Sequence, residues 1–547
     1  MRSYGVSMAR LAGSARTATC IVLLAAIGLG GPGLAAQTDT LAADTMVVAY
    51  PPQQFSLDPL HTFSTTEAQL FTAVYEGLVA YDPITLNPVA GQAERWEISR
   101  DRTTYTFHLR ADARFSNGDP LRAEDFRASW LRILDPGAAA EYSFLFDVIE
   151  GVAEYRSGEL NDPKRVGIRA LSDRVLEVEL TEPADHFLKV LAHHSFSAIH
   201  PGYLGALNWD RAGQLIGNGP FRVSSWTDRE LVLERNEYYW GSSQVELDRL
   251  VVRFYDNPEE VTRAFLQGEI HWANTWAPTG ELRPYVVANP LFATTYFYFR
   301  SDREPFDDER VRHGLALLLP WDRIRDTSRM YFPSDVLVPD IGDYPEVVGI
   351  RERDERRGLK LLDQAGYARG SGLPPISIKV LADSPTVPVA EVMRETWEGL
   401  LGVEVSVQEF RYRDLLEEIR GGDFTLAHQT WVGDFADPLT FLQMWTRSSN
   451  LNDAAYVSRQ YDRAVQRALR AAGPERLQAL AQAEEMLLEE AVILPISHMV
   501  AVNLVNRGWI DGWYPNALDI HPFRFIRFRA LQGPRGVAAV PAATASG

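Results

Sequence analysis

The sequence predicts an α/β protein of several domains, and two observations support this. The chain has 547 residues, which is too long for a single hydrophobic core and favours two to four domains. Between residues 374 and 445 the hydrophobic pattern alternates between strand-like and helical periods, in the order strand, helix, strand, helix, strand. That order is typical of a parallel sheet covered by helices.

The N-terminal half predicts a mixture of strands and helices. Leu70, Val74 and Leu78 recur at near-helical spacing, so we expect a helix within residues 55–82 with one buried face. Asn257 followed by Pro258 predicts a helix start, because asparagine caps the first turn and the first helical residue needs no N–H donor. Strands are expected in TMVVAY, TYTFHLR, RVLEVEL and GPFRVSSWTDRELVLERN, and a helix in RAEDFRASWLRIL.

The segment WVGDFADP, residues 431–438, leaves the third strand of the 374–445 unit. In open sheets of this kind, ligands bind beyond the carboxyl ends of the strands, where loops and helix N-termini converge. The position of the segment therefore makes it a candidate site.

The two aspartates of this segment have different local contexts. Asp437 precedes Pro438 and the helical pattern LTFLQMW, so we interpret it as a helix N-cap. Asp434 comes three residues too early for that role. If it is buried it needs a cation, because an unpaired buried carboxylate is costly or becomes protonated. Sequence periodicity leaves open whether that cation is a ligand or an internal arginine.

The two ends of the chain differ from the rest. Residues 1–36 combine three arginines, the apolar run IVLLAAIGLG and small residues, which predicts a cleaved secretory signal peptide and a periplasmic protein. Cys20, the single cysteine, precedes the apolar run, so we expect release without a lipid anchor. Residues 531–547 are small, Pro-containing and aperiodic, which predicts a disordered tail.

Charge and motifs narrow the function classes. A net charge of −19 repels phosphate backbones, so we expect no nucleic-acid partner. The sequence has no GxSxG, HExxH or GxxxxGK(S/T) motif, which favours a binding protein over an enzyme. The carboxylate pairs of glycosidases would leave no such motif, because the two residues are scattered in the sequence. His193, His194 and His200 lack a shared helical face, so we interpret them as surface or core histidines and expect no metal site.

Several stretches then occur in one characteristic order across nearly all of residues 45–528. They are FSLDPL, YEGLVAYD, AERWEISRDRTTYTFHLRADARFSNGDPLRAEDFRASW, LEVELTEP, NGPFRVSSW, GEIHWAN, EPFDDERVRHGLAL and WVGDFADP. Together they resemble the oligopeptide-binding class of the family 5 extracellular solute-binding proteins, which serve ABC importers. The block from Ala93 to Trp130 is the most specific.

The resemblance implies a periplasmic-binding-protein-like α/β fold, with two lobes of three domains around a ligand cleft and a hinge. It implies a core domain of lobe one in residues 37–75, 199–290 and 500–530, an inserted domain at 76–198, and lobe two at 291–499. The hinge is expected near residues 290 and 500. The 374–445 unit would then lie wholly in lobe two.

The resemblance also implies a set of ligand-binding residues. In the family, an aspartate three residues after a tryptophan receives the peptide's N-terminal ammonium, and the matching residues are Asp434 and Trp431. Val432 matches a position whose backbone pairs with the extended peptide. Tyr142 matches a ligand-facing tyrosine, and Tyr296 is a match on the other lobe.

Three departures from the family pattern concern peptide length and recognition of the peptide's C-terminus. Phe63 replaces a carboxylate of some peptide binders, His428 stands at the family's basic position before the tryptophan, and a disulfide known in some members is absent. Arg411, Arg413 and Arg420 are further candidates for a positive charge.

We therefore expect a binding protein without catalysis or a cofactor that captures short peptides and delivers them to a membrane-embedded ABC permease complex. Main-chain hydrogen bonds between peptide and protein do not depend on the peptide's sequence, so the bound side chains can vary. We expect a monomer. The alternatives are the same fold with a metal chelate, haem or oligosaccharide as ligand, and an exported hydrolase with scattered carboxylates.

Overall fold

The computed structural model describes residues 44–52, 55–62, 64–138, 140, 142–206, 209–211, 215–274, 280–326, 332–449 and 451–529. The predicted signal peptide, Cys20, Phe63 and the predicted disordered tail lie outside these residues. Within the described ranges, no helix combines the length and the apolar character needed to cross a membrane.

The largest sheet in the described part of the chain has 11 strands. They are β1 (Thr45–Tyr50), β8 (Phe221–Trp226), β9 (Glu230–Arg235), β10 (Arg249–Phe254), β11 (Trp272–Asn274), β12 (Val286–Phe299), β13 (Phe332–Pro333), β14 (Ile376–Leu381), β15 (Val405–Phe410), β16 (Leu426–Val432) and β17 (Ile493–Val505). The order is β15-β14-β16-β12-β17-β11-β1-β10-β9-β8, and β13 pairs with β17.

Smaller sheets contain the remaining strands. An antiparallel sheet has the order β4-β5-β7-β6, formed by β4 (Ala93–Ile98), β5 (Thr104–Leu109), β6 (Ile168–Ser172) and β7 (Val175–Glu179). Two strand pairs join β2 (Val79–Tyr81) to β3 (Pro88–Ala90) and β18 (Ile510–Asp511) to β19 (Arg527–Phe528). The strands expected in TMVVAY, TYTFHLR, RVLEVEL and GPFRVSSWTDRELVLERN are confirmed as β1, β5, β7 and the β8–β9 pair.

The helices cover these sheets and several begin where the sequence predicts. They are α1 (Thr65–Val74), α2 (Ala123–Leu134), α3 (Val152–Ser157), α4 (Phe187–Val190), α5 (Pro258–Leu266), α6 (Glu309–Leu317), α7 (Trp321–Asp326), α8 (Glu355–Gln364), α9 (Val387–Leu401), α10 (Tyr412–Gly421), α11 (Leu439–Leu442), α12 (Arg459–Arg470) and α13 (Gly473–Glu489). The predicted cap of α5 is confirmed, since the Glu260 N–H donates to Asn257 Oδ1 at 2.7 Å.

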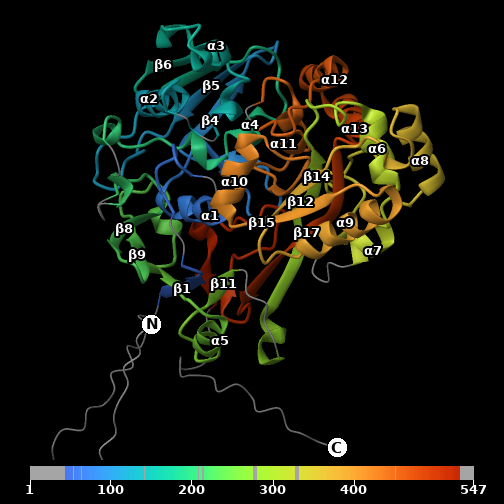
Figure 1. Cartoon of the computed structure of the whole chain (residues 1–547). Helices are drawn as coiled ribbons and strands as arrows, with labels where there is room; N and C mark the ends of the chain where they lie inside the picture. The colour runs from blue at the N-terminus through green and yellow to red at the C-terminus, as the bar shows by residue number, and fades with distance from the viewer. Residues whose placement is uncertain are drawn as a thin grey trace, which may run out of the picture. The chain divides into compact units, whose positions relative to one another are not determined.

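The parallel unit predicted between residues 374 and 445 is confirmed (Figure 1). Its elements follow the order β14, α9, β15, α10, β16, and β14 pairs in parallel with both β15 and β16. Helix α9 ends at Gly402, whose φ of 63° is in the left-handed region that glycine adopts without steric cost. The helix expected in LTFLQMW is shorter than predicted, because α11 stops at Leu442 and a 3₁₀ turn follows.

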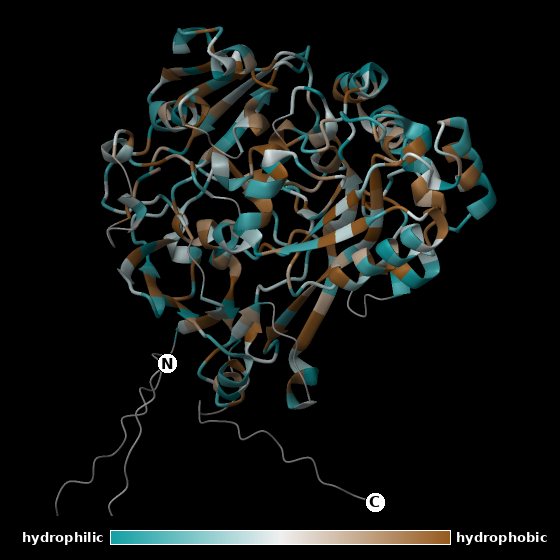
Figure 2. Ribbon diagram, viewed as in Figure 1, coloured by the Kyte–Doolittle hydropathy of each residue, from teal (hydrophilic) through white to brown (hydrophobic). Residues whose placement is uncertain are grey.

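Strands β12 and β17 are the longest in the described chain and lie side by side (Figure 1). Hydrophobic residues concentrate along both, whereas α8 is mainly hydrophilic (Figure 2). Their antiparallel pairing changes register between Pro290 and Thr294. The predicted hinge positions near residues 290 and 500 fall inside these two strands, and the predicted domain boundaries stay a prediction.

Candidate functional site

Strand β16 has one edge that is only partly paired. It pairs with β12 over its whole length, from Leu426 opposite Phe299 to Val432 opposite Ala293. On the other side it pairs with β14 only at Leu426 and Ala427. Along residues 428–432, no other strand of the described chain pairs with that side. An extended chain could therefore add to this edge through main-chain hydrogen bonds.

The chain turns at Gly433 as it leaves β16. The Gly433 N–H donates to the Phe292 carbonyl at 2.8 Å, and a Cβ on this residue would lie 2.6 Å from Phe292 Cδ1. Only glycine fits this close approach. After this turn, the next residue, Asp434, contacts side chains from other elements.

The Asp434 carboxylate is buried among hydroxyl groups. The residue is 8% exposed, and Thr440 Oγ1 donates to its Oδ2 at 3.3 Å. The Tyr142 hydroxyl also donates to this carboxylate. Tyr81, on β2, donates its hydroxyl to the Asp434 carbonyl oxygen at 3.4 Å. Segments far apart in the sequence therefore meet at this one residue.

The electrostatics of Asp434 are those of a carboxylate without a counter-charge. Burial raises its pKa to about 7, although hydrogen bonds from Thr440 and Tyr142 act in the opposite direction. In the described ranges, no lysine or arginine forms an ion pair with it. The internal arginine that the sequence left open is thus not found at Asp434, and the site suits a cationic group from a ligand.

Asp437, only three residues later, is fully satisfied within the protein. Its carboxylate accepts two hydrogen bonds from Arg476 of α13, at 2.9 and 2.7 Å, and lies 3.6 Å from Lys189 Nζ. Burial alone would raise its pKa, but the charge and the hydrogen bonds of Arg476, with smaller contributions from His186 and Lys189, together lower it. Asp437 also accepts the Leu439 N–H at 3.1 Å, but the N-cap of α11 is Pro438, one residue later than predicted.

The residues around Asp437 connect the two chain regions that meet at the site. Lys189 Nζ donates to the Ala436 carbonyl at 3.0 Å, and the rings of His186 and Phe435 are stacked with centroids 6.2 Å apart. These contacts hold the segment around α4 against the loop that carries Asp434.

The other predicted ligand-binding residues take different positions. Trp431 is partly buried, and its indole Nε1 has no hydrogen-bond partner among the described residues. Val432 is half-buried at the last pair of β16. Tyr296 is fully buried, with its hydroxyl donating to Gln429 at 3.2 Å and its ring 5.7 Å from Trp445. The structure therefore brings Tyr142 to Asp434 but places Tyr296 in the core, and its ligand role stays a prediction.

The histidines do not form a metal-binding group. Within the described residues there is no cluster of three or more His, Cys, Asp or Glu side chains that could hold an ion. His193 and His194 lie against Tyr142, with ring centroids 4.5 and 5.6 Å away. His428, at the family's basic position, is 7% exposed, and burial lowers its pKa to about 4. It is therefore neutral at pH 7.

Sequence reasoning missed three residues of this site. Thr440 and Arg476 carry no motif, and Arg476 lies 39 residues from its partner Asp437. Tyr81 stands inside the stretch YEGLVAYD, but the family resemblance assigns it no role. Their roles depend on contacts between distant segments.

Comparisons with known proteins identify the family and the fold of this chain. The profile of the bacterial extracellular solute-binding proteins, family 5 Middle, matches residues 87–453. The periplasmic oligopeptide-binding protein OppA of Escherichia coli (strain K12) is 30% identical over 522 residues, which cover 90% of this chain and 94% of the relative.

Solved structures share the fold. The oligopeptide-binding protein OppAIV of Borrelia burgdorferi has a TM-score of 0.77 at 23% identity, covering 89% of this chain and 100% of the other. Haemophilus influenzae OppA in complex with RPPGFSPFR has a TM-score of 0.75 at 24% identity, covering 89% and 99%. These likenesses confirm the predicted mixed α/β fold of periplasmic binding proteins.

Proposed function

Because this chain belongs to the bacterial extracellular solute-binding proteins of family 5, we propose that it captures short peptides at Asp434 and delivers them to an ABC permease. The family is one of binding proteins and not of enzymes. The proposal includes export to the periplasm as a monomer, after removal of residues 1–36 and without a lipid anchor.

One observation carries the proposal: a buried carboxylate without a counter-charge lies at the end of a strand with a free edge. A peptide's N-terminal ammonium would supply the missing charge, in a charge-assisted hydrogen bond of about 1.5–3 kcal/mol. The peptide backbone would pair with residues 428–432 of β16, which reads no side chains. Tyr142 would lie beside the ammonium, and Trp431 and Val432 beside the first peptide bonds.

The relatives support a peptide as ligand. The Escherichia coli relative is named an oligopeptide-binding protein, and the Haemophilus influenzae structure was solved with a nine-residue peptide, RPPGFSPFR. A metal chelate, haem or oligosaccharide would leave the Asp434 charge without an ammonium to pair with.

The test is native mass spectrometry of the protein purified from its own host, followed by mild denaturation and sequencing of the released material. Peptides of mixed sequence and narrow length are expected. Recovery of a chelate, a haem or a sugar instead of peptides would contradict the proposal.

Peptide affinity should depend on pH through Asp434. Its pKa of about 7 means that the carboxylate of the free protein is protonated below pH 7 and charged above it. A proton and the peptide ammonium therefore compete, and Kd should rise about tenfold for each pH unit below 7. Above about pH 8 the ammonium itself loses its proton, so affinity should be highest near pH 7–8. Isothermal titration calorimetry between pH 5 and 9 measures this.

A matched variant tests whether Asp434 is the titrating group. Tyr142→Phe removes a hydrogen bond that lowers the Asp434 pKa, so the midpoint of the pH dependence should move to higher pH. An N-acetylated peptide, which has no ammonium, should show no such midpoint. The same pH profile for free and acetylated peptides would exclude Asp434 as the cause.

A further inference from the structure

The outer face of α12 carries a row of arginines. Arg459, Arg463, Arg467 and Arg470 are all exposed, and at about 100° per residue they lie within about 80° of one another around the helix axis. We call these four residues the arginine row, which is about 17 Å long. Val457, two residues before α12, is 63% exposed, more than any other large hydrophobic residue of the described chain.

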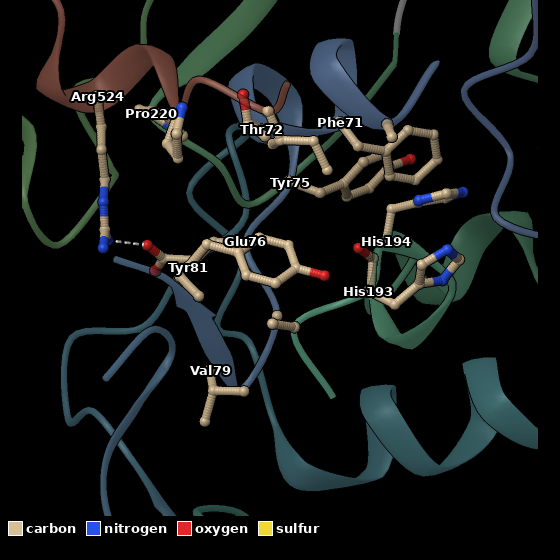
Figure 3. A pocket seen from close by; sticks show the side chains of 17 residues that line it. Phe71, Thr72, Tyr75, Glu76, Val79, Tyr81, His193, His194, Pro220 and Arg524 are labelled. Carbon is tan, nitrogen blue, oxygen red and sulfur yellow. Dashed lines mark hydrogen bonds and ion pairs between the residues drawn. The ribbon is translucent and has the colours of Figure 1, made fainter. Parts of the chain in front are cut away.

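Many arginines of the described chain are neutralised by an acidic residue of the same chain. Figure 3 shows one such ion pair, Arg524 with Glu76, in the wall of a cavity beside α1. No other helix among the described residues exposes two or more positive side chains without also exposing an acidic one. The arginine row is therefore an exception in a protein whose net charge is −19.

The charges of the arginine row are not neutralised within the described chain. Three of its members form no ion pair with any described residue, and the fourth, Arg470, pairs with Glu182 but is 70% exposed. The only acidic residue of α12 is Asp462, and it lies 3.5 Å from Arg447, which belongs to the preceding segment and not to the helix. The row is therefore available to acidic groups of another molecule.

The stability of α12 does not account for the arginine row. Arg467 and Arg470 lie in the last turn, where the helix dipole favours a positive charge. Arg459, however, is the first residue of the helix, where the dipole disfavours a positive charge. Arg463 lies four residues from both Arg459 and Arg467, and like charges at that spacing repel. The N-terminal half of the row therefore opposes helix formation, which indicates a role outside the helix.

The inner face of α12 is connected to the loop that carries Asp434. The Tyr461 hydroxyl of α12 donates to the Leu442 carbonyl, at the end of α11, at 2.6 Å. Helix α13 lies beside α12 and carries Arg476, which pairs with Asp437 of that loop (Figure 1). A molecule bound to the arginine row would therefore be one helix away from the loop of the candidate site.

We propose that the arginine row, together with Val457, is the docking surface for an acidic protein surface on the membrane-embedded complex that receives the ligand. The inference rests on the proposed function, which supplies that complex. Guanidinium groups form paired hydrogen bonds with carboxylates, and arginine is enriched where proteins meet. An anionic lipid surface fits less well, because it repels a protein with a net charge of −19.

The experiment measures peptide uptake by spheroplasts of the protein's own host from which its gene has been deleted. Purified mature protein and labelled Ala-Ala-Ala are added back, and the uptake rate gives the protein concentration for half-maximal uptake. Arg463→Glu with Arg467→Glu should raise this concentration about 10-fold or more, because repulsion replaces attraction. The Kd of the purified variant for Ala-Ala-Ala, measured by calorimetry, should not change.

Two further variants control for charge and for position. Arg463→Lys with Arg467→Lys keeps both positive charges, so its half-maximal concentration should stay within about threefold of the original. Arg356→Glu with Lys360→Glu reverses two exposed charges at the same spacing on α8, and it should change neither uptake nor Kd. Added salt should weaken uptake with the original protein more than with the charge-reversed α12 variant.

The outcomes separate the inference from the proposed function. An unchanged half-maximal concentration for the charge-reversed α12 variant, or an equal rise for the α8 variant, would overturn the inference and leave peptide capture intact. Binding to phosphatidylglycerol vesicles, or a dimer in analytical ultracentrifugation, that is lost in the α12 variant would assign the row to a lipid surface or a second copy instead. If the original protein neither binds Ala-Ala-Ala nor supports its uptake, the proposed function fails, and the inference fails with it.

Discussion

Replacing Asp434 by asparagine is expected to weaken binding of a free short peptide by about 2–5 kcal/mol, or roughly 30-fold to a few thousand-fold in Kd. The variant keeps the shape of the side chain and removes its charge, so the peptide's ammonium would be buried without a partner. Calorimetry or fluorescence titration at pH 7.5 measures the change.

The unliganded variant should be at least as stable as the original protein. Burial raises the folded-state pKa of Asp434 to about 7, above its value in the unfolded chain. Such a group stabilises the folded state at low pH, and this contribution is lost as the pH rises through the folded pKa. Above pH 7 the charged Asp434 therefore opposes folding, and Asp434→Asn should not lower the denaturation midpoint.

Two controls make the Asp434 result specific. Asp423→Asn changes the net charge by the same amount at a side chain that is 96% exposed, and it should leave Kd unchanged. An N-acetylated peptide should bind the original protein and Asp434→Asn with similar, weak affinity. If Asp434→Asn keeps full affinity for a free peptide, the ammonium is held elsewhere.

Replacing Arg476 by methionine is expected to destabilise the fold by about 3–5 kcal/mol at pH 7, because it leaves Asp437 buried beside only the more distant Lys189. Both members of the pair are nearly inaccessible, with Arg476 4% and Asp437 3% exposed. Guanidinium-induced unfolding followed by circular dichroism measures the loss.

The loss of stability caused by Arg476→Met should be smaller at acidic pH. Since the folded-state pKa of Asp437 is lowered, the pair stabilises the protein above the unfolded pKa of about 3.9, and this stability is lost as the pH falls through the lower folded pKa. The free energies of unfolding of the original protein and the variant should therefore converge below about pH 4.

A matched control uses the same substitution on a neighbouring helix. Arg470 of α12 pairs with Glu182 at 2.6 Å but is 70% exposed, so Arg470→Met should change the free energy of unfolding little. The double variant Asp437→Leu with Arg476→Met should regain much of the loss, because no charge remains buried. Equal losses of stability for Arg470→Met and Arg476→Met would contradict the prediction that the buried Asp437 pair contributes more to stability than an exposed one.

Local patterns predicted the elements well where a segment is stabilised by its own periodicity. The 374–445 unit was predicted with its helix end at Gly402. The prediction succeeded because the spacing of apolar residues within each strand and helix marks the face that is buried. The cap at Asn257 was predicted for the same reason, since its partner is three residues away. The helix in LTFLQMW was predicted too long, because the same apolar spacing also fits a short helix followed by a 3₁₀ turn.

The candidate site was predicted less completely. Position at the carboxyl edge of the sheet indicated WVGDFADP, and the family resemblance assigned roles to Asp434 and Tyr142, which the fold brings together. Tyr296 was assigned on the same ground, but alternation along a strand gives two faces and does not say which one meets a ligand. In the structure its side chain faces Trp445.

The sequence by itself determined the α/β class, the parallel unit and the position of Asp434 at the end of its third strand, because these depend on residues close together in the chain. Only the tertiary structure decided which aspartate has a partner. Arg476 reaches Asp437 and no arginine or lysine of the described chain reaches Asp434, so one carboxylate is charged and structural, while burial leaves the other with a pKa near 7. Burial and charge pairing are set by distant segments, and no local pattern records them.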